Sequence, residues 1–85
     1  MVTVYSKPAC PQCNDTKTML NSLGVEFTEV DMSRDPAALK KVMSLGHRSA
    51  PVVMTAEGDS WAGFKRDKIE ALASAGDSAF DDIYA

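Results

Sequence analysis

The chain has 85 residues and a formal net charge of −3, and these values already exclude several classes of protein. A chain of this length forms one small domain. Two cysteines and one histidine are too few for a disulfide-rich secreted scaffold or a zinc finger. The acidic balance argues against a general nucleic-acid binder, which needs a basic face. Hydrophobic residues at 45% and charged residues at 25% are typical of a folded globular domain.

Signals for export or membrane insertion are not expected from this sequence. The N-terminal residues lack a basic stretch followed by an apolar segment, and no apolar run approaches the roughly 20 residues that span a bilayer. We therefore expect a cytoplasmic protein with no membrane partner. In a reducing compartment, a closely spaced cysteine pair is more often catalytic or metal-binding than a permanent structural link.

The first half of the chain reads as strand, helix and strand. Residues 1–5 are rich in β-branched and aromatic side chains, which favours a strand. A helix follows, with Pro11 in its first turn and Gly24 as its stop. Its apolar and small residues recur at helical spacing at Cys13, Thr16, Leu20 and Leu23. The second strand is predicted to contain Val25, Phe27, Thr28 and Val30 and to end near Asp31.

The second half reads as helix, hairpin and helix. Asp35 followed by Pro36 indicates a helix start, and Gly46 indicates its stop. Residues 52–54 form a short apolar strand, a turn lies at 57–59, and residues 60–62 are the antiparallel partner strand. A last helix ends by Gly76. The apolar positions of these two helices are Leu39, Val42 and Met43, then Ile69, Leu72 and Ala73.

The order β-α-β-α-β-β-α predicts an α/β fold. A strand–helix–strand opening implies a parallel pair, and the hairpin adds antiparallel strands, so we expect a mixed four-stranded sheet with helices on both faces. Residues 1–75 form the predicted domain. Residues 76–85 form an acidic C-terminal tail that is either frayed or docked through its apolar residues.

The cysteine pair Cys10-Pro11-Gln12-Cys13 lies where the first strand ends and the first helix begins. A helix N-terminus stabilises a thiolate through its free N–H groups and its partial positive charge, and Lys7 adds a cation nearby. We expect Cys10 to attack a substrate disulfide and Cys13 to resolve the mixed disulfide. A structural metal site, a cluster shared between two copies, or buried cysteines without chemistry are the alternatives.

A second unusual stretch is Trp61-Ala62-Gly63-Phe64. At least one of the two rings is expected in the core, and the other would form an apolar docking patch for a protein partner. His47 and Arg48 are expected to be solvated loop residues rather than catalysts. The cations at the start of the last helix either aid solubility or steer an acidic partner: Lys65, Arg66 and Lys68.

Three segments together resemble the NrdH-redoxins, glutaredoxin-like members of the thioredoxin-fold superfamily. The segments are Tyr5-Ser6-Lys7-Pro8-Ala9-Cys10-Pro11-Gln12-Cys13, Ala50-Pro51-Val52-Val53 and Trp61-Ala62-Gly63-Phe64-Lys65-Arg66-Asp67. The resemblance covers roughly residues 1–75.

The resemblance implies a thioredoxin/glutaredoxin-like fold and a dithiol electron donor. Such proteins reduce the disulfide of the class Ib ribonucleotide reductase large subunit and are recharged by thioredoxin reductase with NADPH. It therefore implies a monomer whose redox centre is a Cys10–Cys13 disulfide, with no bound cofactor.

The resemblance also assigns supporting roles around the cysteines. A cis-proline, here Pro51 after Ala50, would face the cysteine pair and hold the substrate backbone. The family's Trp-Ser-Gly-Phe-Arg-Pro-Asp stretch ties the loop around the site by hydrogen bonds. The supporting and substrate-binding residues are accordingly Lys7, Pro11, Gln12, Ala50, Pro51, Trp61, Gly63, Phe64 and Asp67.

Several positions depart from the family pattern. Pro11 makes the motif partly glutaredoxin-like, Arg66 replaces the usual Pro, and Ala62 replaces the usual Ser. The alternative function is therefore a glutathione-dependent glutaredoxin that uses Cys10 alone. Gln12 between the cysteines, and Trp61 in place of a Gly-Gly element, favour the dithiol reading over that alternative.

Overall fold

A computed structural model describes residues 2–74 of the chain and confirms the predicted order of elements. The elements are β1 (Val2–Ser6), α1 (Pro11–Ser22), β2 (Phe27–Asp31), α2 (Pro36–Ser44), β3 (Val52–Met54), β4 (Ser60–Ala62) and α3 (Arg66–Ser74). None of the helices within this range is long and apolar enough to cross a membrane.

The strands form one mixed four-stranded sheet in the order β2-β1-β3-β4. β1 is parallel to β2 and antiparallel to β3, and β3 is antiparallel to β4. β1 is therefore an interior strand of the sheet. The cysteine motif follows its C-terminal end. This topology is that of the thioredoxin-like fold.

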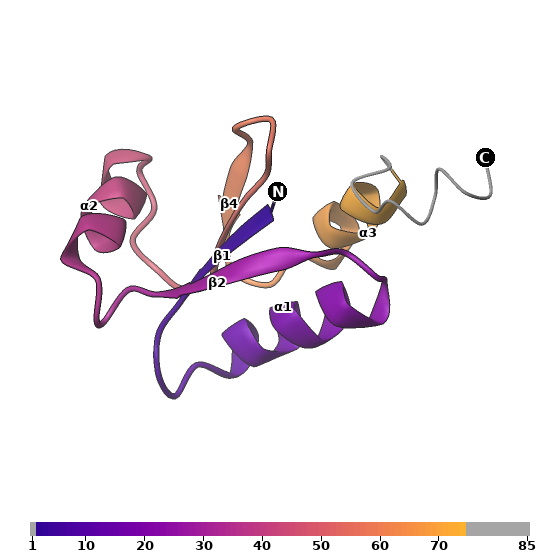
Figure 1. Ribbon diagram of the computed structural model, residues 1–85, viewed down its shortest axis with the longest axis horizontal. Coiled ribbons are helices and arrows are strands. Elements are labelled where there is room, and N and C mark those ends of the chain that lie inside the picture. The colour runs from indigo at the N-terminus through magenta and orange to yellow at the C-terminus, as the bar shows by residue number, and fades with distance from the viewer. Residues whose placement is uncertain (1, 75–85) are drawn as a thin grey trace.

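Alternation along β1 and β3 separates two buried cores. Val4 and Val53 belong to a core that also contains Leu20 of α1 and Ile69 of α3. Their neighbours along the strands turn to the opposite face, where they meet α2, because successive side chains of a strand alternate in direction. Figure 1 shows the strands lying between α2 and the pair formed by α1 and α3. The prediction of helices on both faces is thus confirmed.

The helices α1 and α2 begin in the same way. Cys10 and Asp35 are the N-caps of α1 and α2, and each is followed by a proline in the first turn. Proline is favoured there because the first turn has no use for its missing N–H. Gly24 and Gly46 follow the helices with φ of 73° and 89°, left-handed values that glycine adopts without steric cost.

Two details differ from the sequence-based expectation. Val25 was predicted in the second strand, but β2 begins at Phe27. Val25 instead donates its N–H to the Leu20 carbonyl at 2.9 Å, which ties it to the end of α1 while its side chain enters the core. Leu39 and Met43 fit the helical spacing of an apolar face, yet they are 44% and 57% exposed. The predicted tail at 76–85 lies outside the described residues.

Candidate active site

Cys10 ends the loop after β1 and caps α1 with its sulfur. Its backbone is extended, with φ −118° and ψ 99°, and its Sγ accepts a hydrogen bond from the Cys13 N–H at 3.1 Å. Its carbonyl accepts from the Asn14 N–H at 3.2 Å and so begins the helical hydrogen-bond series. The sulfur therefore stands at the positive end of α1, where free N–H groups favour a thiolate over a thiol.

Cys13 lies one turn inside α1 and is joined to Cys10 by a disulfide, with 5.2 Å between the two Cα atoms. Cys13 is 2% exposed and Cys10 is 7% exposed. The structure thus represents the oxidised form of the pair. The distance lies within the range that disulfides occupy without backbone movement.

Three segments distant in sequence meet beside the cysteine pair. The Ala50–Pro51 peptide bond is cis, as the resemblance implied. The Pro51 carbonyl accepts from the Gly63 N–H at 2.7 Å, and the Gln12 side-chain oxygen accepts from the Phe64 N–H at 3.2 Å. Gln12, one of the two residues between the cysteines, therefore binds the loop after β4 to the start of α1.

Gly63 is favoured at this meeting point by its backbone conformation. Its φ is +86°, in the left-handed region that favours glycine. A Cβ at this position would stand 3.5 Å from the Gln12 side-chain oxygen, an ordinary van der Waals distance, so the constraint comes from the backbone angle and not from lack of space. A larger residue would therefore strain the loop at the point where it approaches the site.

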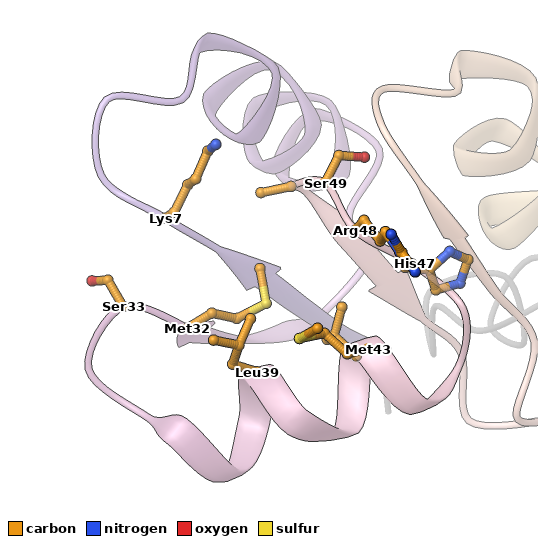
Figure 2. Close-up of a pocket in the computed structure, with 10 residues that line it drawn as sticks. Lys7, Met32, Ser33, Leu39, Met43, His47, Arg48 and Ser49 are labelled. Carbon is orange, nitrogen blue, oxygen red and sulfur yellow. The ribbon is translucent and has the colours of Figure 1, made fainter.

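An apolar groove of about 450 Å³ lies between α2 and the loop that leads into β3. Figure 2 shows Leu39 and Met43 rising from α2 toward Met32, with Lys7 and Ser49 across the groove. The exposure of Leu39 and Met43 noted above is explained by this position. The remaining lining residues are Ser33, Val42, His47, Arg48 and Ala50. Lys7 and Arg48 make the groove cationic, and none of its lining residues is acidic.

On the other side of Lys7, a polar hollow contains Cys10. Glu29 of β2 accepts hydrogen bonds there from the Lys17 ammonium at 2.7 Å and the Ser6 hydroxyl at 2.8 Å. The Lys17 hydrogen bond, followed by that of Ser6, lowers the pKa of Glu29 below its ordinary value of 4.5. Sequence reasoning missed this trio, because Lys17 and Glu29 meet only through the packing of α1 on the sheet.

The Trp-Ala-Gly-Phe segment divides between the core and the surface. Trp61 is 4% exposed and belongs to the core between α1 and α3, whereas Phe64 is 38% exposed. This outcome confirms that at least one ring is buried and leaves Phe64 as the exposed one. Lys68 of α3 stands over the Trp61 ring, 5.7 Å from its centre, a distance typical of a cation–π contact.

The other residues singled out in the sequence form no hydrogen bond or ion pair with the cysteine pair in the described part of the chain. Asp67 is exposed in the first turn of α3, and its side chain makes no hydrogen bond or ion pair within residues 2–74. Arg66 pairs with Glu70 at 3.2 Å on the helix surface. His47 bonds the Ser60 hydroxyl at 2.9 Å. In the described part of the chain no cluster of three or more His, Cys, Asp or Glu side chains could hold a metal ion.

These features define the class of the protein. A disulfide between an N-cap cysteine and a buried cysteine one turn later, beside a cis-proline in a thioredoxin-like sheet, is the site of a thiol–disulfide oxidoreductase. The glutaredoxin family model matches residues 2–59. The chain belongs to the glutaredoxin family, among its NrdH glutaredoxin-like proteins.

Similar sequences and similar solved structures both include NrdH proteins. The glutaredoxin-like protein NrdH of Salmonella typhimurium is 40% identical over 84% of this chain and 86% of its own length. That of Lactococcus lactis subsp. cremoris is 37% identical over 86% of this chain and its own full length. The solved NrdH-redoxin of Escherichia coli superposes with a TM-score of 0.79 at 34% identity, covering 84% of this chain and 92% of its own.

The Glu29 trio predicts a pH-dependent contribution to stability. A carboxyl whose folded pKa is depressed stabilises the folded state above its unfolded pKa, near 4.5, and loses that effect as the pH falls through the folded pKa. Glu29→Gln should therefore lower the free energy of unfolding by about 0.5 kcal/mol at pH 7, a value already reduced for solvent exposure. The difference from wild type should shrink as the pH falls from 7 to 3, as Glu29 becomes protonated in the folded protein.

Urea unfolding at the two pH values measures this effect. Glu26→Gln is the matched control, because Glu26 is an exposed carboxyl just before the same strand. An equal loss of stability at pH 7 and pH 3, or an equal loss in the control, would contradict the assignment to the Lys17 and Ser6 hydrogen bonds.

Proposed function

We propose that this protein is a dithiol electron donor that reduces the disulfide of a class Ib ribonucleotide reductase large subunit in the cytoplasm. Thioredoxin reductase recharges it with electrons from NADPH. It acts as a monomer without bound cofactor and without a nucleic-acid or membrane partner. The observation that carries the proposal is the unequal placement of the two sulfurs, Cys10 at the cap of α1 and Cys13 inside it.

The reaction proceeds in two exchanges. The reduced Cys10 thiolate attacks one sulfur of the substrate disulfide, forms a Cys10–substrate disulfide, and releases the other substrate sulfur as a thiolate. The Cys13 thiolate then attacks Cys10 Sγ, so the Cys10–Cys13 bond forms and the mixed disulfide breaks. The substrate leaves as a dithiol after taking up two protons, and the protein has lost two electrons.

The surroundings of the pair suit a polypeptide substrate. The loop at Gly63 and Phe64 is bonded to Pro51 and to Gln12 between the cysteines, and the groove lined by Lys7 and Arg48 reaches Ala50, the residue before the cis-proline. We propose that the partner's chain places an apolar side chain in this groove and acidic side chains at its cationic rim. The similarity to the Escherichia coli NrdH-redoxin, described as having a thioredoxin-like activity profile, supports the same assignment.

A glutathione-dependent reaction is the second candidate. Pro11 is typical of glutaredoxins, and Lys7 and Arg48 would also suit the carboxylates of glutathione. Gln12 argues against it, because its side chain is committed to the Phe64 N–H at the edge of the site. The two candidates differ in their reductant and are separated by supplying each reductant in turn.

The choice of reductant tests the proposed function. The oxidised large subunit is incubated with this protein and either NADPH with thioredoxin reductase, or NADPH with glutathione and glutathione reductase, and NADPH oxidation is followed. We expect rapid turnover in the first system and at least about tenfold slower turnover in the second. Cys10→Ser supplies the background rate. Turnover confined to the glutathione system would overturn the proposal.

A charge reversal at the groove tests the docking of an acidic partner. Arg48→Glu should raise the KM for the large subunit several-fold, by about 1 kcal/mol or more of lost attraction, with little change in kcat. Lys40→Glu is the matched control, because Lys40 is exposed on α2 but does not line the groove. Equal KM values for the two variants would contradict a role for the groove.

A further inference from the structure

A buried hydroxyl lies next to Cys13 on its helix without a hydrogen-bond partner. Thr16 is fully buried, and its Oγ1 is one of two buried side-chain polar atoms within residues 2–74 that have no partner. The other is the Trp61 indole nitrogen. Buried hydroxyls are normally hydrogen-bonded, so an unpartnered one in this position needs a physical reason.

Thr16 follows Cys13 by three positions in α1, and both belong to the buried face of that helix. Side chains three apart on a helix are neighbours on one face. In the oxidised form the Cys13 sulfur is bonded to Cys10. When the disulfide is reduced, that sulfur becomes a thiol or a thiolate, and a thiolate accepts hydrogen bonds strongly.

A buried Cys13 thiolate has few other sources of stabilisation. Apart from the aromatic Tyr5 and Trp61, the buried polar side chains of the described residues are Ser6, Thr16 and Thr55. The Ser6 hydroxyl is bonded to Glu29, and Thr55 accepts from the Asp59 N–H in the hairpin. Burial in apolar surroundings disfavours a thiolate unless a donor faces it. Thr16 is therefore the buried hydroxyl of this set that shares a helix face with Cys13 and donates to no other group.

We propose that Thr16 donates a hydrogen bond to the Cys13 sulfur in the reduced protein and so stabilises the thiolate that resolves the mixed disulfide. The hydroxyl keeps its proton throughout. The Cys13 thiolate attacks Cys10 Sγ, the Cys10–Cys13 bond forms, and the substrate sulfur leaves as a thiolate. Because a thiolate accepts a hydrogen bond more strongly than a disulfide sulfur does, Thr16 also favours the dithiol form over the disulfide.

The inference rests on the dithiol mechanism and is tested with 5,5′-dithiobis(2-nitrobenzoate), a small aromatic disulfide. Reduced protein releases a first aromatic thiolate when Cys10 attacks the reagent and a second when Cys13 attacks the mixed disulfide. Thr16→Val keeps the shape and removes the hydroxyl. We expect its second phase to slow about tenfold at pH 7 and its pH midpoint to rise by about one unit, with the first phase unchanged.

Two further variants separate the hydroxyl from packing. Thr16→Ser keeps the hydroxyl and should retain the wild-type second phase. Thr18→Val makes the same change at an exposed position of α1 and should behave as wild type. If valine prevents folding, Thr16→Ala removes the hydroxyl with a smaller side chain. Equilibration in a dithiothreitol redox buffer should show Thr16→Val and Thr16→Ala shifted toward the disulfide, with Thr18→Val unchanged.

Each outcome decides the proposal. A wild-type second phase in Thr16→Val or Thr16→Ala overturns it, as does a slowed phase without a shifted pH midpoint. Equal slowing in Thr16→Ser or Thr18→Val also overturns it, because the hydroxyl would then not be the cause. Failure of the wild type to release a second thiolate would instead contradict the dithiol mechanism itself, so the two ideas fail separately.

Discussion

The hydrogen bond from the Cys13 N–H to the Cys10 sulfur, 3.1 Å long, is the interaction on which the site depends. It makes the nucleophile the N-cap of α1. Capping side chains usually contribute an oxygen and stabilise a helix by about 1 kcal/mol. A sulfur accepts less strongly when it is bonded in a disulfide than when it is a thiolate. Reduction therefore strengthens the cap, so the helix start and the chemistry of Cys10 favour the same ionisation state.

The start of α2 has the same backbone arrangement as the start of α1, although α2 carries no cysteine. Asp35 caps α2 by accepting from the Ala38 N–H at 3.1 Å, and Pro36 follows it, as Pro11 follows Cys10. Both helices thus use an acceptor, a proline and an N–H three residues later. The difference is the capping atom, which is a sulfur in α1 and a carboxylate oxygen in α2. A sulfur at this position, with another sulfur one turn later, turns an ordinary helix start into a redox centre.

Local patterns carry most of the fold in this sequence. The caps, the prolines and the glycines that end helices are local signals, so the order and the bounds of the elements follow from short stretches. The start of β2 does not, because Val25 is apolar and β-branched but its N–H is taken by the Leu20 carbonyl. Leu39 and Met43 likewise fit an apolar helix face, and only the groove above α2 explains their exposure.

The parts of the site formed by neighbouring residues in the sequence could be predicted. The parts formed by residues distant in the sequence could not. The cysteine pair is contiguous, so its position at the start of α1 follows from the sequence. The hydrogen bond from the Phe64 N–H to Gln12 joins residues 52 positions apart. The Ser6–Glu29–Lys17 trio depends on the parallel pairing of β1 with β2. Such contacts are set by the register of the sheet and by helix packing, which no local pattern encodes.

The central claim is that the helix start makes the two cysteines unequal, with Cys10 as the nucleophile and Cys13 as the protected resolving thiol. Limited alkylation of the reduced protein with iodoacetamide at pH 7, followed by peptide mass spectrometry, tests it most directly. The account predicts that Cys10 is modified first and that Cys13 stays largely unmodified while the protein is folded. Equal labelling of both cysteines, or faster labelling of Cys13, would contradict it.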